Sequence, residues 1–194
     1  MAGGKPDFKL WKGEIDQISF LLSPSKRSTH ASMVFTLLAH NSIADAMWQV
    51  DPAAQLIGVG AEGEWSQTML RESADKMNLI SEHIYCRELD TVSAHIDQIA
   101  NSIKKVADAH RIYRSEIEGV AEKDIRIAMD EWNYWYGDYI YGELGVRYHH
   151  KDALGIAKGL HEFFRNSDLF FMANYAQTVN VIGCIKTTAT SAGF

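Results

Sequence analysis

The chain has 194 residues, of which 46% are hydrophobic and 23% are charged, the composition of one globular α/β domain. The formal net charge of −6 and the absence of a basic run longer than Lys26-Arg27 argue against nucleic acid as a partner. Cys86 and Cys184 provide no disulfide framework and favour reduced thiols. The first residues lack the apolar core of a signal peptide, and no apolar run is long enough for a membrane helix. We therefore expect a cytoplasmic protein without a membrane partner.

Helix and strand patterns alternate from about residue 30 onward. Helical spacing of apolar residues predicts helices over residues 31–50, 64–76, 89–114 and 151–165. Short apolar runs predict strands over residues 55–60, 79–85, 125–129 and 169–173. This order predicts an α/β fold with parallel strands and right-handed crossovers. Residues 1–30 are an unassigned N-terminal segment with a loop at 23–28, and residues 31–194 form the expected domain.

The segment 125–136 is the most informative stretch. A β-branched apolar run stops at Asp130 and Glu131, and an aromatic cluster follows, made of Trp132, Tyr134, Trp135 and Tyr136. An α/β barrel places catalytic groups at the carboxyl ends of its strands, and aromatic faces beside a carboxylate suit a sugar. A surface loop that merely begins with two carboxylates is an equally good interpretation of the local pattern. Side-chain alternation along a strand predicts that Asp130 turns away from Glu131 and braces the loop or a nearby cation.

Three motifs resemble those of the glycoside hydrolase family 51 α-L-arabinofuranosidases. The segment 130–137, DEWNYWYG, is similar to the nucleophile motif of that family, in which the glutamate matches Glu131. The segment 81–85, SEHIY, resembles the family's histidine–x–tyrosine, and the segment 171–180, FMANYAQTVN, resembles a strand near the end of the barrel. The motifs occur in the family's order, and the resemblance runs from roughly residue 45 to 188.

The resemblance implies a (β/α)8 TIM barrel, of which the four predicted strands are the fifth to eighth, so the chain is expected to be a fragment. It implies retaining hydrolysis of terminal non-reducing α-L-arabinofuranosyl residues from arabinan- or arabinoxylan-type oligosaccharides, with Glu131 as nucleophile. The implied substrate-binding residues are His83, Tyr85, Trp135 and Gln177. No cofactor is expected, and the expected partners are an arabinose-containing sugar and either a second copy or the missing barrel half.

Simpler interpretations stand beside these roles. His83 can be a core histidine bonded to a backbone carbonyl, and Tyr85 and the tryptophans can serve packing alone. The family's acid/base is the glutamate of an Asn-Glu pair, and this dipeptide does not occur here, so no residue is given that role. We therefore expect the isolated chain to be inactive, and a non-catalytic half-barrel that binds sugar is the alternative function.

A rival motif is the G-x-G-x-x-G pattern of Gly58, Gly60 and Gly63, which lies between a predicted strand and a predicted helix, with Glu82 further on. This pattern is typical of dinucleotide binding and suggests a nucleotide-binding oxidoreductase. Glu62 would place negative charge beside the pyrophosphate, which disfavours that alternative.

The adjacent pair His149-His150 has no cysteine or carboxylate at a recurring ligand spacing, so we expect no metal site there. The pair is instead expected in a polar loop before a helix.

Overall fold

The computed structural model describes residues 29–137, 140 and 145–193. The unassigned segment that ends at residue 30 therefore lies outside the described residues, except for its last two positions. Those two positions begin helix α2, Thr29–Val50.

Four parallel strands form the main sheet in the order β1-β2-β3-β4. Their bounds are β1 Ile57–Gly58, β2 Leu79–Cys86, β3 Arg126–Tyr134 and β4 Phe170–Tyr175. The connecting helices are α3 Glu64–Ser73 with the 3₁₀ turn η1 Ala74–Lys76, α4 Val92–Glu116 and α5 His150–Arg165. The predicted parallel βα repeat is confirmed. An antiparallel pair near the end of the chain, β5 Lys186–Thr187 and β6 Ala192–Gly193, was not predicted.

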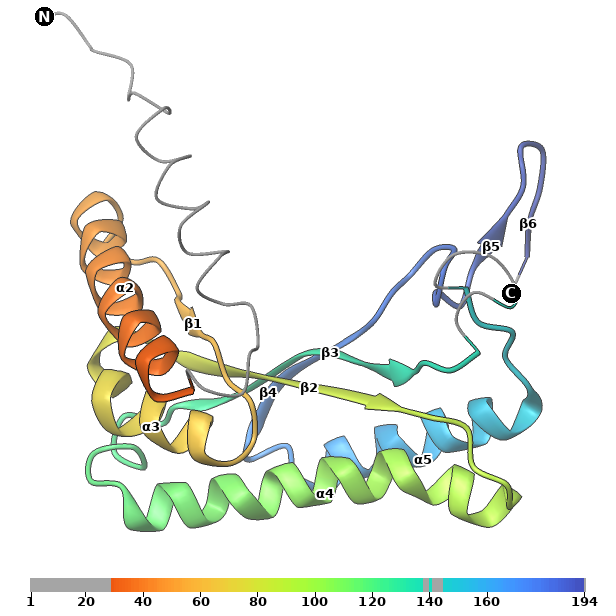
Figure 1. The fold of residues 1–194 in the computed structure, drawn as a ribbon, viewed down its shortest axis with the longest axis horizontal. Helices are drawn as coiled ribbons and strands as arrows, with labels where there is room; N and C mark the ends of the chain where they lie inside the picture. Colours follow the sequence, from red (N-terminus) through yellow and green to blue (C-terminus); the bar gives the residue numbers. More distant parts are fainter. Residues whose placement is uncertain (1–28, 138–139, 141–144, 194) are drawn as a thin grey trace, which may run out of the picture.

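Helices α4 and α5 lie side by side beneath one face of the sheet (Figure 1). Side chains of the strands alternate accordingly, because successive residues of a strand point to opposite faces. In β2, Ile80, Ile84 and Cys86 are buried toward the helices, whereas His83 is exposed on the opposite face. We call this opposite face the open face, since no described helix packs against it.

Two apolar clusters stabilise the fold. The first fills the space between the sheet and helices α4 and α5, and its members include Ile99, Ile103, Ile127, Met129, Trp132, Tyr134, Phe163 and Phe170. The second joins α2 and α3 to the start of β2 and the end of α4, through Met33, Leu37, Met69, Leu70, Ile80, Tyr113 and Val120. Full burial of such a side chain contributes roughly 1.5–3 kcal/mol. The helix-covered face therefore carries most of the packing.

The prediction that the third strand ends at Met129 is wrong. Strand β3 continues to Tyr134 through a bulge: Glu82 of β2 pairs with Met129, and the next residue, His83, pairs with Glu131. Asp130 is the extra residue. A bulge adds one residue to one strand and re-aims the side chains that follow it. The two carboxylates therefore lie within the strand rather than in a loop after it.

Smaller differences concern the ends of elements. The strand expected over 55–60 is reduced to Ile57–Gly58, and the helix expected over 89–114 runs over Val92–Glu116. The prediction for the histidine pair is confirmed for His149, which is the N-cap before α5, and is wrong for His150, which is the first residue of that helix. None of the described helices is long and apolar enough to span a bilayer.

Candidate active site

Glu131 lies on the open face with two of its predicted partners. The Tyr85 hydroxyl donates a hydrogen bond of 2.8 Å to Glu131 Oε2. His83 Nδ1 is 3.7 Å from the same oxygen. Strand register explains the grouping, because Tyr85 and His83 are two residues apart on β2, and His83 pairs with Glu131 on β3. The structure thus brings these three residues together at one site.

Glu131 and its neighbours have the exposure that a substrate site needs. The side chains of Glu131 and His83 are 47% and 49% exposed. Burial, together with the hydrogen bond to Glu131, raises the pKa of the Tyr85 hydroxyl. Tyr85 therefore stays protonated at neutral pH and acts as the donor to Glu131.

Asp130 does not turn away from this site, so the alternation argument for it was wrong. Its Oδ1 lies 2.9 Å from His83 Nε2, an ion-pair contact when the ring is protonated. The bulge is the physical reason, since it breaks the two-residue alternation that would have placed Asp130 and Glu131 on opposite faces.

The two tryptophans have different surroundings. Trp135 packs edge-on against Tyr85, with ring centroids 5.4 Å apart, and so lies beside the Glu131 site. Its Nε1 is shielded from solvent and has no hydrogen-bond partner among the described residues. Trp132 is buried against Phe163 and Tyr175 on the helix-covered side. Trp132 is thus a core residue, while Trp135 is available to form a wall.

Gln177 is exposed and lies beyond the end of β4. Its amide donates to the Val179 carbonyl at 3.3 Å, and it makes no hydrogen bond or ion pair with the Glu131 group. The preceding residue, Ala176, is tied to β3: its N–H donates to the Trp132 carbonyl at 3.2 Å. The side-chain amide of Asn133 donates a hydrogen bond of 2.5 Å from its Nδ2 to the Ala176 carbonyl oxygen. Asn133, buried within the nucleophile motif, is a positioning residue that the sequence argument missed.

Asp152 is a second group that the sequence argument missed. Its carboxylate accepts hydrogen bonds from the Tyr136 hydroxyl at 2.8 Å and from the His149 N–H at 2.6 Å. His95 Nε2 is 2.8 Å away, and the Leu89 N–H donates to His95 Nδ1, so the ring proton lies on Nε2 and points to Asp152. This buried cluster joins the segments that follow β2 and β3 to the start of α5.

The two glutamates named with the rival glycine motif, Glu82 and Glu62, have other partners than Glu131. Glu82 is 1% exposed and faces the helices, where its carboxylate accepts from Ser66 Oγ and the Glu62 N–H, each at 2.7 Å. His110 Nε2 is 2.8 Å from the same carboxylate. The Glu62 side chain pairs with Lys105 of α4.

Packing and backbone conformation explain why glycines occupy the three positions of the rival motif. A Cβ on Gly60 would lie 2.0 Å from the Ser81 carbonyl oxygen, and one on Gly58 would lie 2.7 Å from Met77 Sδ. Gly63 has φ +114°, a conformation that L side chains rarely adopt. Close contact of β1 with its neighbours and the turn into α3 therefore account for this pattern.

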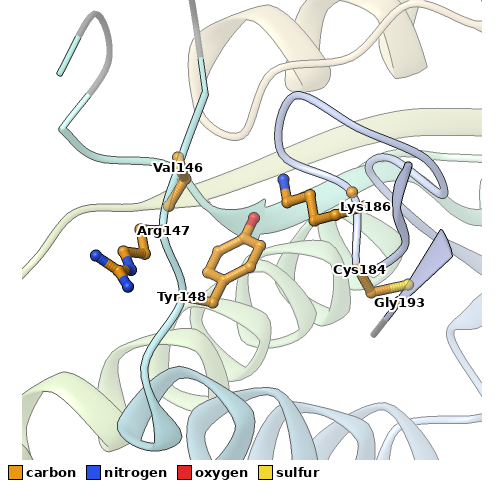
Figure 2. Close-up of a pocket in the computed structure, with 7 residues that line it drawn as sticks. Val146, Arg147, Tyr148, Cys184, Lys186 and Gly193 are labelled. Atoms are coloured by element: carbon orange, nitrogen blue, oxygen red, sulfur yellow. The ribbon is translucent and has the colours of Figure 1, made fainter. Parts of the chain in front are cut away.

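A hollow of about 460 Å³ lies near the end of the chain (Figure 2). Its lining residues are Val146, Arg147, Tyr148, Gly183, Cys184, Lys186 and Gly193. Lys186 Nζ donates to the Val181 carbonyl at 2.7 Å, and burial lowers the pKa of this amine. None of the predicted site residues lines this hollow. Among the described residues, no group of three or more histidine, cysteine or acidic side chains is arranged to hold a metal ion.

Comparisons with known proteins show what this chain is similar to. The family model for the α-L-arabinofuranosidase C-terminal domain matches residues 130–193. An intracellular exo-α-(1→5)-L-arabinofuranosidase of Streptomyces lividans is 28% identical over 74% of this chain and 25% of its own length. α-L-Arabinofuranosidase C of Emericella nidulans is 32% identical over 75% of this chain and 32% of its own length. The chain is thus similar in sequence to α-L-arabinofuranosidases.

Solved structures show the same fold. The α-L-arabinofuranosidase of Thermotoga maritima, in its arabinose complex, superposes with a TM-score of 0.73 at 23% identity and covers 88% of this chain. The family 51 enzyme of Thermotoga petrophila gives a TM-score of 0.70 at 24% identity. The resemblance to α-L-arabinofuranosidases is confirmed, as is the mixed α/β fold with a parallel sheet. The chain spans only a quarter to a third of the length of the Streptomyces and Emericella enzymes.

Proposed function

We propose that this chain carries the nucleophile of a retaining α-L-arabinofuranosidase, and that the nucleophile is Glu131. The observation that carries the proposal is the placement of Glu131 on the open face, where it accepts a hydrogen bond from Tyr85. A half-exposed carboxylate held by a donor is suited to attack an anomeric carbon and form a glycosyl–enzyme ester. The proposed substrates are terminal non-reducing α-L-arabinofuranosyl residues of arabinan- or arabinoxylan-type oligosaccharides.

Residues 31–194 are proposed to form the second half of a (β/α)8 barrel, with the open face turned to the barrel interior. The helix-covered face and the parallel order β1-β2-β3-β4 support this arrangement. Glu131, His83 and Tyr85 would then lie at the mouth of the barrel, where active sites of such barrels occur. Trp135 is proposed as a wall of the sugar site and Gln177 as an amide that binds a sugar hydroxyl.

The acid/base is proposed to come from outside this chain. A retaining glycosidase needs a second carboxyl group about 5–5.5 Å from the nucleophile. Glu82 faces the other side of the sheet and Glu62 is paired with Lys105, so neither is a candidate. Loss of general acid assistance costs about 10²–10⁴-fold in rate. The isolated 194 residues are therefore expected to show no measurable hydrolysis of natural arabino-oligosaccharides.

Covalent labelling tests the nucleophile without needing the acid. The purified chain is incubated with an aryl α-L-arabinofuranoside whose leaving group scarcely needs protonation, and intact and peptide mass spectra are recorded. The expected result is a trace of arabinosyl adduct on the peptide that contains Glu131. Glu131→Gln should abolish the adduct, and Glu88→Gln, a surface carboxylate paired with Lys151, should retain it. An adduct on another residue would refute the assignment.

The same preparation separates the two alternatives. Saturable binding of arabinose or an arabino-oligosaccharide without any adduct would favour the non-catalytic sugar-binding half-barrel. A saturable fluorescence titration with NAD would favour the nucleotide-binding oxidoreductase. Robust release of arabinose from arabinan by the purified chain would contradict the proposal that the acid/base lies elsewhere.

A further inference from the structure

Because of the bulge in β3, the carboxylates of Asp130 and Glu131 both lie close to the imidazole ring of His83. Without the bulge, alternation would place Asp130 and Glu131 on opposite faces of the sheet. With it, Asp130 Oδ1 lies 2.9 Å from His83 Nε2, while Glu131 Oε2 lies 3.7 Å from His83 Nδ1. Each ring nitrogen of His83 therefore faces a different carboxylate, one of which is the proposed nucleophile.

The contact made by Asp130 uses a carboxylate oxygen that is itself shielded from solvent, while the side chains of Asp130 and His83 are 32% and 49% exposed. Asp130 Oδ1 is buried and has no aligned hydrogen bond with any described residue, so His83 Nε2 is its close polar neighbour. A shielded carboxylate oxygen needs a compensating donor or positive charge, because burial of an unpaired charge is costly. This requirement favours the ring orientation that turns a nitrogen, rather than a carbon, toward Asp130.

The orientation of the ring has a consequence at Glu131. If the imidazole were flipped about its Cβ–Cγ bond, a carbon atom would face each carboxylate in place of a nitrogen. With Nε2 against Asp130, Nδ1 faces Glu131 Oε2, the oxygen that also accepts from Tyr85. Within the described part of the chain, both polar contacts of Glu131 fall on Oε2. The other oxygen, Oε1, is thus left for attack on the sugar.

We propose that Asp130 is a positioning residue that acts through His83: it holds the imidazole with Nδ1 toward Glu131 and so helps to fix which carboxylate oxygen meets the substrate. The expected effect of Asp130 on the reactivity of Glu131 rests on the proposed function of Glu131. The expected effect of Asp130 on the orientation of the His83 ring is independent of that function. Tyr85, Asp130 and Glu131 are the titratable groups that contact this ring or its acceptor, and all three come from β2 and β3.

The first readout is the ring of His83 itself. The chain is labelled with ¹⁵N-histidine, and the His83 signals are assigned by their loss in His83→Gln. Asp130→Asn keeps the size of the side chain and removes its charge, so the His83 ring nitrogen signals should shift, because the carboxylate that faces Nε2 is lost. Asp168→Asn, a matched change at a surface carboxylate paired with Arg111, should leave them unchanged. Unchanged His83 signals in a folded Asp130→Asn chain would overturn the proposal.

The second readout is the rate of covalent labelling at Glu131. Because misplacement of a reacting group lowers its rate, Asp130→Asn should slow labelling about tenfold. In the His83→Gln background the same substitution should have no further effect, since the two residues act as a unit. An equal loss in both backgrounds would overturn action through His83. If the unaltered chain forms no adduct but the His83 signals respond to Asp130→Asn, the nucleophile proposal fails and the orienting role of Asp130 stands.

Discussion

Glu82 and Glu131 lie on neighbouring strands and face opposite sides of one sheet, in very different surroundings. Glu82 is 1% exposed, and its two oxygens accept from Ser66 and the Glu62 N–H and contact His110. Glu131 is 47% exposed, and its contacts with Tyr85 and His83 both fall on one oxygen. Ser66 and His110 belong to helices α3 and α4, and Glu62 lies in the turn before α3. The partners of Glu131, Tyr85 and His83, come instead from the neighbouring strand β2.

The contrast separates a structural carboxylate from the proposed nucleophile. A buried carboxylate is tolerated when its oxygens are satisfied, and Glu82 meets this condition by joining α3, β2 and α4. A nucleophile needs the opposite arrangement, with one oxygen held and the other free. The sequence alone presents both as glutamates in or beside strands, and only their partners distinguish them.

The sharpest test of this comparison is Glu131→Ala in an assembly that also contains the rest of the barrel. Loss of the nucleophile should lower turnover by on the order of 10⁴-fold or more. Added azide should restore activity and give an arabinosyl azide of inverted configuration, because a small anion can occupy the space of the lost carboxylate. The measurement is release of an aryl leaving group, with product configuration determined by NMR. Wild-type rates in Glu131→Ala would refute the assignment.

Substitution of Glu82 by alanine should lower the free energy of unfolding rather than change the activity. Glu82→Ala leaves His110 and Ser66 buried without their partner, and breaking a buried pair costs about 3–5 kcal/mol. Glu131→Ala is the matched control and should change the free energy of unfolding by less than about 0.5 kcal/mol. Urea unfolding followed by circular dichroism compares the two variants. Equal losses would show that both faces of the sheet contribute similarly to stability, contrary to the comparison.

Most of the fold could be predicted from sequence, because strand and helix periodicities here are strong. The apolar stripe of α4 and the short apolar run at 79–85 each predicted an element within a few residues of its observed ends. The short β1 was overestimated, since an isolated apolar run does not show how many residues find a pairing partner. The hairpin of β5 and β6 was missed because its strands are two residues long and lack an apolar pattern.

The site was predicted in part. Glu131, Tyr85 and His83 lie together as the motifs indicated, but Asp130 was misplaced because a bulge leaves no signature in the local sequence. Asn133 and Asp152 were missed for a different reason. Their roles depend on partners far along the chain, at Ala176 and His95, and no local spacing shows such contacts.

The open face also predicts association of the isolated chain. Strands β1 and β4 are the two edges of the described sheet, and Phe171 on β4 is 56% exposed. Unpaired edge strands and exposed apolar surface favour pairing with another chain. We expect dimers or larger species by size-exclusion chromatography with light scattering. Phe171→Lys should increase the monomer fraction, while Phe164→Lys, on the exposed side of α5, should do so less. A monodisperse monomer with a sharp cooperative melt would contradict this expectation.

The smallest expected effect is a loss of stability at alkaline pH that originates on the helix-covered face. Burial raises the pKa of the Cys86 thiol to about 11 from a usual value near 9, although the Ser102 hydroxyl opposes the shift. The unfolded chain then releases this proton at lower pH than the folded chain does. Stability from this group is therefore complete below about pH 9 and is lost as the pH rises toward 11.

After allowance for partial contact with solvent, the Cys86 effect should be on the order of 1 kcal/mol. Burial also raises the pKa of Tyr134 and Tyr136, so a further loss of the same sign should follow above pH 10. Urea unfolding at pH 8, 9.5 and 10.5 measures the trend, and Cys86→Ala should lessen the decline between the first two of these values. Cys184→Ala, which changes an exposed thiol, is the control and should decline as the unaltered chain does. Stability that stayed constant up to pH 10.5 would show that the Cys86 thiol ionises as easily in the folded chain as in the unfolded one.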